Sequence, residues 1–362
     1  MTVLVVGASG LVGRAAVDAF LAAGREVVAV SRRRPETAGD VIHLPVDLTD
    51  ATATRAALAP YEGITHVVYA AAYEKPGLVA GWSDPEQMAV NRAMLQNVLS
   101  GLAGSGSLRQ VTLMQGTKAY GVHLHPIPVP ARERHPRDPH ENFYWLQEDL
   151  LREAAGVQGF DWTILRPVQI VGPAYGVAYC TPPVVGVLAA ICHQEGLDFG
   201  FPGAPDAPVK QVADVRLVAD ALVWAAESPA ARGEHFNLTN GEVFTWQELW
   251  PHLGATMGVP ATGPRPRVLS GFFAGHAGTW DRIVRRHGLR PLSLAEVLGQ
   301  SHLYADYTFG SLPTSSTRPA LVSTIKVKQA GFGAVRDTEE TFEHALRTLV
   351  DRRVLPDLRG PR

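Results

Sequence analysis

The stretch TVLVVGASGLVG, residues 2–13, decides the fold class. Its first half is a continuous apolar and β-branched run, which is typical of a strand buried on both faces of a parallel sheet. Its second half places Gly7, Gly10 and Gly13 between that strand and a helical pattern. Gly7 permits a tight turn, Gly10 lets backbone approach a pyrophosphate, and Gly13 lets the helix pack closely on the strand. The stretch therefore predicts the opening of a dinucleotide-binding domain.

Strand and helix patterns continue to alternate through the first half of the chain. Further strands are predicted at residues 26–31, 41–47, 65–71, 110–115 and 161–167. Amphipathic helices are predicted near residues 50–58, 85–103 and 141–155. This order predicts an α/β fold with a Rossmann-type, doubly wound parallel sheet.

The second half is less regular and predicts a smaller, interleaved substrate domain. Helices are expected near residues 183–195, 245–257, 278–287, 293–302 and 338–353. The pattern VADVRLVADALVWAAES, residues 212–228, predicts a helix that returns to the first sheet. We therefore assign residues 1–172 to the cofactor-binding domain, with 211–240 returning to it. Residues 173–210 and 241–362 are assigned to a substrate-binding or lid domain.

Composition narrows the class of protein. The 362 residues include 33 basic and 35 acidic side chains, and the formal net charge is −2. The sequence has no concentration of lysine and arginine that would indicate a nucleic-acid or membrane partner. The two cysteines, Cys180 and Cys192, are too few for a disulfide framework, and the N-terminus resembles no signal peptide. We expect a cytoplasmic protein.

The residues after the second strand predict the cofactor. Sites specific for NAD place an acidic side chain there, against the ribose hydroxyls. This chain has Ser31, Arg32 and Arg33 instead, and guanidinium groups bind a 2′-phosphate well. The pattern therefore favours NADPH/NADP⁺. Asp47, after the third strand, is placed to accept a hydrogen bond from the adenine amino group.

A tyrosine opens the helix predicted near residues 141–155. In short-chain dehydrogenases a tyrosine in this place is followed four residues later by lysine. Here, in NFYWLQEDLL, Tyr144 is followed at that distance by Glu148. An ammonium group must then come from elsewhere, or the chemistry is lost.

Several motifs together resemble one family. They are MQGTKAYG (114–121), NFYWLQEDLL (142–151), RPVQIVG (166–172), GEHFNLTNGEVFTW (233–246) and TWDRIVRRHGLRP (279–291). These resemble the progesterone 5β-reductase/iridoid synthase-like 1,4-enone reductases, which are atypical extended short-chain dehydrogenases. The resemblance runs from Val3 to about Gly333.

The resemblance implies a set of site residues, an activity and an assembly. Lys118 would replace the missing lysine and act with Tyr144, while Glu148 would have no catalytic role and would face solvent or a neighbouring element. The activity implied is NADPH-dependent reduction of the C=C bond of an enone or enal, by a homodimer. The cofactor contacts that we predict are Gly7, Ser9, Gly10, Leu11, Gly13, Ser31, Arg32, Arg33, Asp47, Leu48, Ala71, Met114, Lys118, Tyr144 and Ile170.

The chemistry of the pair leaves alternatives open. Hydride delivered to the β-carbon of an enone puts negative charge on the carbonyl oxygen, and a phenol hydroxyl aimed there stabilises the enolate. The same tyrosine could instead protonate an alkoxide, as in a carbonyl (1,2) reductase. A sugar-nucleotide epimerase would ordinarily keep the Tyr-x-x-x-Lys pair. A non-catalytic NADP-sensing regulator is the alternative from another class.

Two further features bear on the site. Ala72 stands where plant relatives carry an active-site tryptophan, which suggests a differently shaped pocket. Four histidines at 123, 125, 135 and 140 lie on a proline-rich loop without cysteine partners. Metal sites place their ligands at fixed spacing on ordered elements, so we expect no metal here.

Overall fold

The computed structural model describes residues 1–75, 80–312 and 318–360. The chain divides into two compact units that are interleaved along the sequence. The first unit comprises Met1–Val168, Val215–Leu238 and Val322–Ala334, and the second comprises Gln169–Asp214, Thr239–Leu321 and Val335–Arg362. The prediction assigned all of residues 241–362 to the second unit, whereas residues 322–334 belong to the first.

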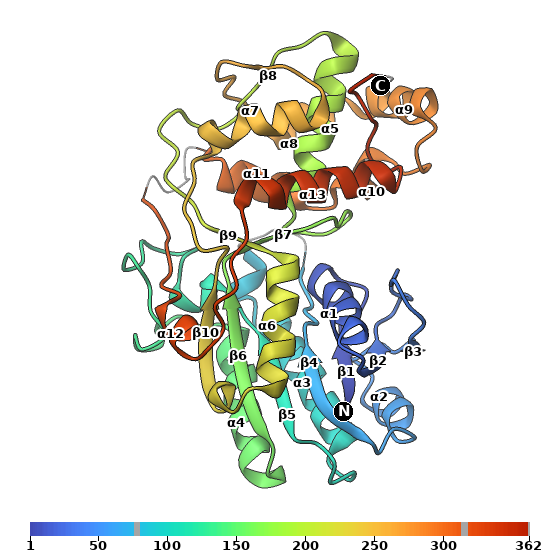
Figure 1. Ribbon diagram of the computed structural model, residues 1–362, viewed down its shortest axis with the longest axis vertical. Helices are drawn as coiled ribbons and strands as arrows, with labels where there is room; N and C mark the ends of the chain where they lie inside the picture. Colours follow the sequence, from blue (N-terminus) through green and yellow to red (C-terminus); the bar gives the residue numbers. More distant parts are fainter. Residues whose placement is uncertain (76–79, 313–317, 361–362) are drawn as a thin grey trace. The chain divides into compact units, whose positions relative to one another are not determined.

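A parallel sheet organises the first unit (Figure 1). Among the described residues it has seven strands in the order β10-β6-β5-β4-β1-β2-β3. Every neighbouring pair is parallel, so the predicted fold class is confirmed. The strands are β1 (Thr2–Val6), β2 (Glu26–Val30), β3 (Ile42–Leu44), β4 (Ile64–Tyr69), β5 (Gln110–Met114), β6 (Asp161–Pro167) and β10 (Glu234–Leu238).

Helices cover both faces of this sheet. On one face α1 packs beside α6, the helix predicted to return from the second half. On the other face α2, α3 and α4 pack in sequence, and their apolar side chains share one core with β1, β4 and β5. The helices are α1 (Leu11–Ala22), α2 (Ala51–Leu58), α3 (Pro85–Leu102), α4 (Phe143–Gln158) and α6 (Val215–Glu227).

The returning segment Val322–Ala334 is attached to the sheet edge by a buried asparagine. Asn237 of β10 donates from Nδ2 to the backbone oxygens of Ser323 and Ala131, and its Oδ1 accepts from the Tyr120 hydroxyl at 2.7 Å. The short helix α12 (Ile325–Gln329) then packs on β10. No strong sequence pattern marked this return, because it depends on one side chain that is distant in the chain.

The second unit is mostly helical. Its centre is α5 (Thr181–Glu195), whose first twelve residues are all buried. Around it pack α7 (Trp246–Met257), α9 (Ala277–His287), α10 (Leu294–Leu298), α11 (Ser301–Thr308) and α13 (Thr338–Asp351). The remaining elements are α8 (Leu269–Ala274) and two pairs of short parallel strands, β7 (Gln169–Val171) with β9 (Val212–Asp214) and β8 (Phe199–Gly200) with β11 (Ala261–Thr262).

The single helix predicted over residues 293–302 is wrong. The chain forms α10 and α11, with Gly299 between them at φ +52°. A Cβ on Gly299 would lie 2.6 Å from backbone atoms of Gly176 and Val177. Glycine is needed here for both the positive φ and the close approach of the two backbones.

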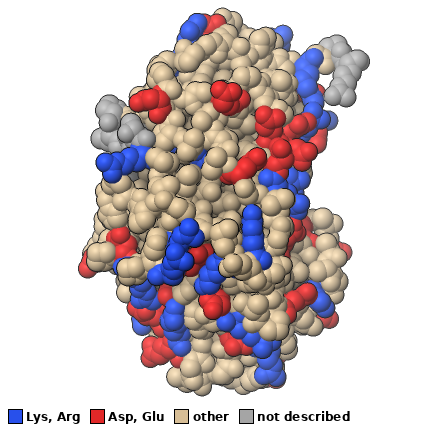
Figure 2. All heavy atoms as spheres, turned by 60° about the vertical axis from the view of Figure 1, so that its left-hand side comes forward, with Lys and Arg blue, Asp and Glu red and all other residues tan. Residues whose placement is uncertain are grey.

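The surface carries charges of both signs. On the face drawn in Figure 2, lysine and arginine side chains are interspersed with aspartate and glutamate. Among the described residues, no helix is both long and apolar enough to cross a bilayer.

Candidate active site

The glycine loop between β1 and α1 forms a cradle made of backbone. Gly7 has a φ of +85°, and a Cβ there would lie 2.8 Å from the carbonyl of Ala70 and the amide nitrogen of Ala71. A Cβ on Gly13 would lie only 2.1 Å from the Gly7 oxygen. No side chain caps the N-terminus of α1 at Gly10, so its first N–H groups remain for an anion. The loop fits a dinucleotide pyrophosphate.

The other predicted cofactor residues of the first unit follow the strand ends. Half-buried Ser9 and Leu11 belong to the glycine loop. Ala71 and Leu48 follow β4 and β3, while Met114 is the last residue of β5, paired with Leu165 of β6. This is the carboxyl edge of the sheet, where ligands of such folds bind. Ile170 instead lies in β7 of the second unit.

The end of β2 presents the two predicted arginines. Ser31 is buried, and its hydroxyl donates to the backbone oxygen of Arg33 at 2.6 Å, which fixes the turn. Arg32 and Arg33 are exposed. Asp47 accepts at Oδ1 from the amide and hydroxyl of Thr49. These bonds, with a smaller effect of the Arg32 charge, hold the pKa of Asp47 below its usual value. The carboxylate therefore stays an acceptor at neutral pH.

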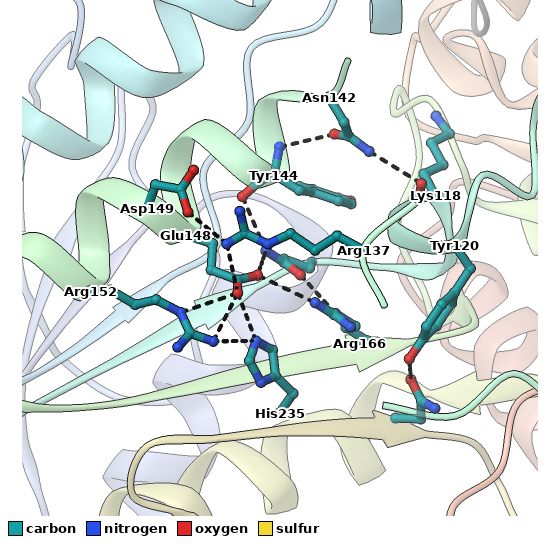
Figure 3. Close-up of polar contacts among 12 residues, drawn as sticks. Lys118, Tyr120, Arg137, Asn142, Tyr144, Glu148, Asp149, Arg152, Arg166 and His235 are labelled. Atoms are coloured by element: carbon teal, nitrogen blue, oxygen red, sulfur yellow. Dashed lines mark hydrogen bonds and ion pairs between the residues drawn. The ribbon is translucent and has the colours of Figure 1, made fainter. Parts of the chain in front are cut away.

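Lys118 and Tyr144 converge on one indole. Lys118 lies in η2 (Thr117–Tyr120), and its Nζ is 3.6 Å from the ring centroid of Trp82. Tyr144, in the first turn of α4, packs edge-on against the same indole with centroids 5.1 Å apart. A Cβ on Gly116 would lie 3.4 Å from the Tyr144 hydroxyl, so this hydroxyl reaches the segment that carries Lys118. In Figure 3 the Tyr144 ring extends from α4 toward that segment.

Burial sets the ionisation of both groups. Desolvation raises the pKa of Tyr144, the nearby charge of Glu74 raises it further, and the charge of Arg166 lowers it. Desolvation also lowers the pKa of Lys118 to about 7, against the opposing charge of Glu74. Tyr144 thus keeps its proton at neutral pH and can donate a hydrogen bond, while Lys118 changes charge near neutrality.

Glu148 is buried in a cluster of cations (Figure 3). Its side chain is only 3% exposed, so of the two surroundings expected for it, solvent or a neighbouring element, the structure shows the second. Its carboxylate accepts from cationic or polar groups of a loop, of α4 itself, of β6 and of β10. These are Arg137 (2.9 Å), Arg152 (3.0 Å), Arg166 (3.4 Å) and His235 (3.1 Å).

The cluster reaches Tyr144 through one amide. Gln115, directly after β5, accepts from Arg166 Nε at 2.8 Å and donates to the carbonyl oxygen of Tyr144 at 3.3 Å. Although burial alone would raise the pKa of Glu148, the hydrogen bond and charge of His235 and the charges of the arginines hold it well below its usual range. Glu148 therefore supports the first turn of α4 and stays ionised.

Several contributors were not predicted from the sequence. Trp82 stands on η1 (Ala80–Ser83), and no local pattern distinguishes it. Asn142 does carry a signal, because asparagine directly before an apolar helical run is a common N-cap. Tyr120, two residues after Lys118, is buried and bonded to Asn237. Among the described residues, no group of three or more His, Cys, Asp or Glu is arranged to hold a metal ion.

The comparisons with known proteins identify the family of this chain. Residues 3–239 match the model of the NAD dependent epimerase/dehydratase family. The chain belongs to this family. It is 30% identical to a 3-oxo-Delta(4,5)-steroid 5-beta-reductase of Arabidopsis thaliana, over 94% of this chain and 89% of that one. It is 29% identical to an (S)-8-oxocitronellyl enol synthase of Antirrhinum majus, over 88% and 81% of the two chains. The resemblance seen in the sequence is confirmed.

Solved structures of the family share the fold. The UDP-glucose 4-epimerase of Bifidobacterium longum, in complex with NAD⁺ and UDP, superposes with a TM-score of 0.69 at 17% identity, over 97% and 98% of the two chains. That of Thermus thermophilus, in complex with NAD, gives 0.64 at 19% identity over 100% of both chains. The present chain is thus an oxidoreductase of the NAD(P)-dependent short-chain dehydrogenase/reductase superfamily.

The first prediction concerns Glu148. Replacing it by Gln removes the charge that neutralises the buried Arg166, and breaking a buried ion pair from one side costs about 3 kcal/mol of unfolding free energy. Turnover per folded molecule should stay near normal, because the carboxylate bonds to arginines, His235 and Gln115 and not to the Tyr144 hydroxyl. Because the pKa of Glu148 is held below 4.5 in the fold, the loss should be complete above pH 4.5 and shrink below it.

Urea unfolding of the variant against Glu153→Gln, an exposed position on the same helix, measures this loss. The control should change by less than about 0.5 kcal/mol. Equal stabilities of the two variants would show that the cluster does not depend on Glu148.

The second prediction concerns Lys118. Its pKa of about 7 means that the ammonium is present below pH 7 and is lost as the pH rises. Since kcat/KM for a substrate reports groups of the free enzyme, kcat/KM for the reduced nicotinamide cofactor should fall as the pH rises above about 7. Lys118→Arg, whose side chain does not titrate in this range, should remove the fall. A flat profile in the parent protein would contradict the assignment of this charge to Lys118.

Proposed function

We propose that this protein is an NADPH-dependent reductase of the C=C bond of α,β-unsaturated carbonyl compounds. One observation carries the proposal: Lys118 and Tyr144 meet on the Trp82 ring although they lie far apart in the sequence. They supply a phenol and an ammonium group without a lysine four residues after the tyrosine. The relatives named for steroid 5-beta-reduction and for enol synthesis support the same reading.

The charge and burial of Tyr144 and Lys118 determine the role that each would have in the reaction. When bound, NADPH supplies the hydride for the β-carbon of the substrate. Tyr144 donates a hydrogen bond from its hydroxyl to the carbonyl oxygen, where negative charge develops, and solvent then protonates the α-carbon of the enolate. Because burial raises the pKa of Tyr144, it remains a hydrogen-bond donor. Lys118, in its charged form, offsets the developing negative charge, and the Trp82 face holds the ammonium in place.

Cofactor choice follows from the loop after β2. The glycine cradle at Gly7, Gly10 and Gly13 would hold the pyrophosphate. The exposed guanidinium groups of Arg32 and Arg33 would bind a 2′-phosphate, while no acidic side chain occupies positions 31–33 to repel it. We therefore propose NADPH in preference to NADH.

Two alternatives remain as outcomes of the tests. Full proton transfer from Tyr144 would suit a carbonyl (1,2) reductase with the same residues. A non-catalytic NADP sensor would need neither Tyr144 nor Lys118, and their meeting on one indole argues against it. For the assembly we propose a homodimer, as the family resemblance implies, and sedimentation equilibrium would test it. For the location we propose the cytoplasm.

The third prediction concerns the arginines. Losing one charge-assisted contact to the 2′-phosphate should weaken NADPH binding by about 1.5–3 kcal/mol in Arg32→Ala and Arg33→Ala. NADH has no such phosphate and should bind unchanged. Arg34→Ala, in the same exposed loop, is the matched control and should keep the ratio of the two affinities. An unchanged ratio in all three variants would contradict the assignment.

The fourth prediction tests the function itself. Tyr144→Phe keeps the ring and its contact with Trp82, so the fold should survive, while reduction of 2-cyclohexen-1-one should slow by roughly 10²-fold or more. Tyr120→Phe is the matched control, since that hydroxyl bonds Asn237 and should not enter the reaction. Full activity in Tyr144→Phe would remove the residue on which the proposal rests.

A further inference from the structure

The N-terminus of α4 is joined to the Lys118 segment by one side chain. Asn142 accepts at Oδ1 from the backbone N–H of Tyr144 at 2.9 Å, which caps the helix. Its Nδ2 donates to the backbone oxygen of Lys118 at 3.2 Å. Figure 3 shows both bonds. Asn142 is 2% exposed, so water does not replace either partner easily.

The partners fix the orientation of this amide. A backbone N–H can only donate and a backbone carbonyl can only accept, so Oδ1 must face Tyr144 and Nδ2 must face Lys118. Nδ2 is also 3.0 Å from Nε2 of His140. Because Nδ2 can only donate, Nε2 of His140 must be the acceptor. The ring proton then sits on Nδ1.

Asp138 holds that tautomer. Nδ1 of His140 lies 2.6 Å from Asp138 Oδ1 and donates to it. The other carboxylate oxygen of Asp138 pairs with Nε2 of His125 at 2.9 Å. His125 is about half exposed, and its two ring nitrogens contact Asp138 and the Pro126 carbonyl, so it lies outside the route to Asn142. A series of hydrogen bonds with fixed donors and acceptors therefore runs from Asp138 through His140 to Asn142, and ends at the backbones of Tyr144 and Lys118.

We propose that His140 is a positioning residue for the reductase site, acting through Asn142. It accepts from the second N–H of the Asn142 amide, while the Lys118 carbonyl accepts from the first, and so sets the spacing between the segment of Lys118 and the first turn of α4. Asp138 fixes the ring tautomer that makes this possible. The inference rests on the proposed function, because it assigns His140 to the geometry of the Tyr144–Lys118 pair. A misplacement of about 1 Å at a reacting pair is worth up to about 10²-fold in rate.

Two substitutions of His140, by side chains of nearly equal size, distinguish the loss of its hydrogen-bond acceptor from the loss of its packing. His140→Gln places an amide oxygen near the position of Nε2 and keeps an acceptor for Asn142. His140→Asn is one methylene shorter and reaches only the position of Nδ1, toward Asp138. Both lose the ring contacts with His123 and Trp145, at 5.3 and 6.4 Å between centroids. His125→Ala removes the other partner of Asp138 and serves as the control that leaves activity unchanged.

The test combines kinetics with hydrogen–deuterium exchange of the full chain without cofactor. His140→Asn should lower kcat for 2-cyclohexen-1-one by roughly tenfold or more, with KM for NADPH changed less than about twofold. His140→Gln should recover most of kcat. Peptides covering residues 115–121 and 142–146 should exchange faster in His140→Asn than in His140→Gln.

The two proposals fail in distinguishable ways. Unchanged kcat and unchanged exchange in His140→Asn would overturn the positioning role. Equal losses in His140→Asn and His140→Gln would overturn it too, since the ring and not the acceptor would then matter. If the parent protein reduced no enone at all, the proposed function would fail. The exchange difference between the two variants would still decide whether His140 holds the segments together.

Discussion

One buried carboxylate constrains how this site can be built. Glu148 accepts from Arg137, Arg152, Arg166 and His235, which come from four different elements. A lysine at this position would place a fourth positive charge among three arginines, beside the buried Arg166, while the exposed Asp149 pairs with Arg137. Desolvated like charges are costly, and such a lysine would lose its proton. While this cluster exists, the ammonium that we propose to act with Tyr144 has to come from another segment. Lys118 supplies one on the Trp82 ring, against which Tyr144 also packs.

The balance of charge around Tyr144 and Lys118 has a chemical consequence. Both groups are desolvated. Desolvation raises the pKa of Tyr144, so the phenol keeps its proton, and lowers the pKa of Lys118 to about 7, so the ammonium loses its proton near neutral pH. A neutral phenol that donates without losing its proton suits an enolate that only needs a hydrogen bond. Glu74 raises the pKa of both groups, so it opposes ionisation of the tyrosine and favours charge on the lysine. Substrate and cofactor charges would shift this balance further, since a group with a pKa near 7 responds to small changes in its surroundings.

Much of the fold was predictable, because the signals were local. Apolar runs marked the strands of the parallel sheet, and the glycines at 7, 10 and 13 marked a turn in which a Cβ would collide with backbone. The pairing of Lys118 with Tyr144 came from a resemblance in motifs, and the structure brings both to one indole. Trp82 could not be predicted, since its contact with the pair depends on tertiary packing alone. The burial of Glu148 could not be predicted either, because the groups that bind its carboxylate come from distant parts of the sequence, as far along the chain as His235. The returning segment Val322–Ala334 depends on Asn237 in the same way.

The position of the transferred hydrogen tests the central claim most directly. The protein would be given 2-cyclohexen-1-one with NADPH that carries deuterium at the transferred position of the nicotinamide, and the product would be analysed by NMR. If Tyr144 holds the carbonyl oxygen while hydride goes to the far end of the double bond, deuterium appears at the β-carbon and the ketone remains. Deuterium on the carbonyl carbon, in an allylic alcohol, would contradict the account and show a carbonyl reductase instead.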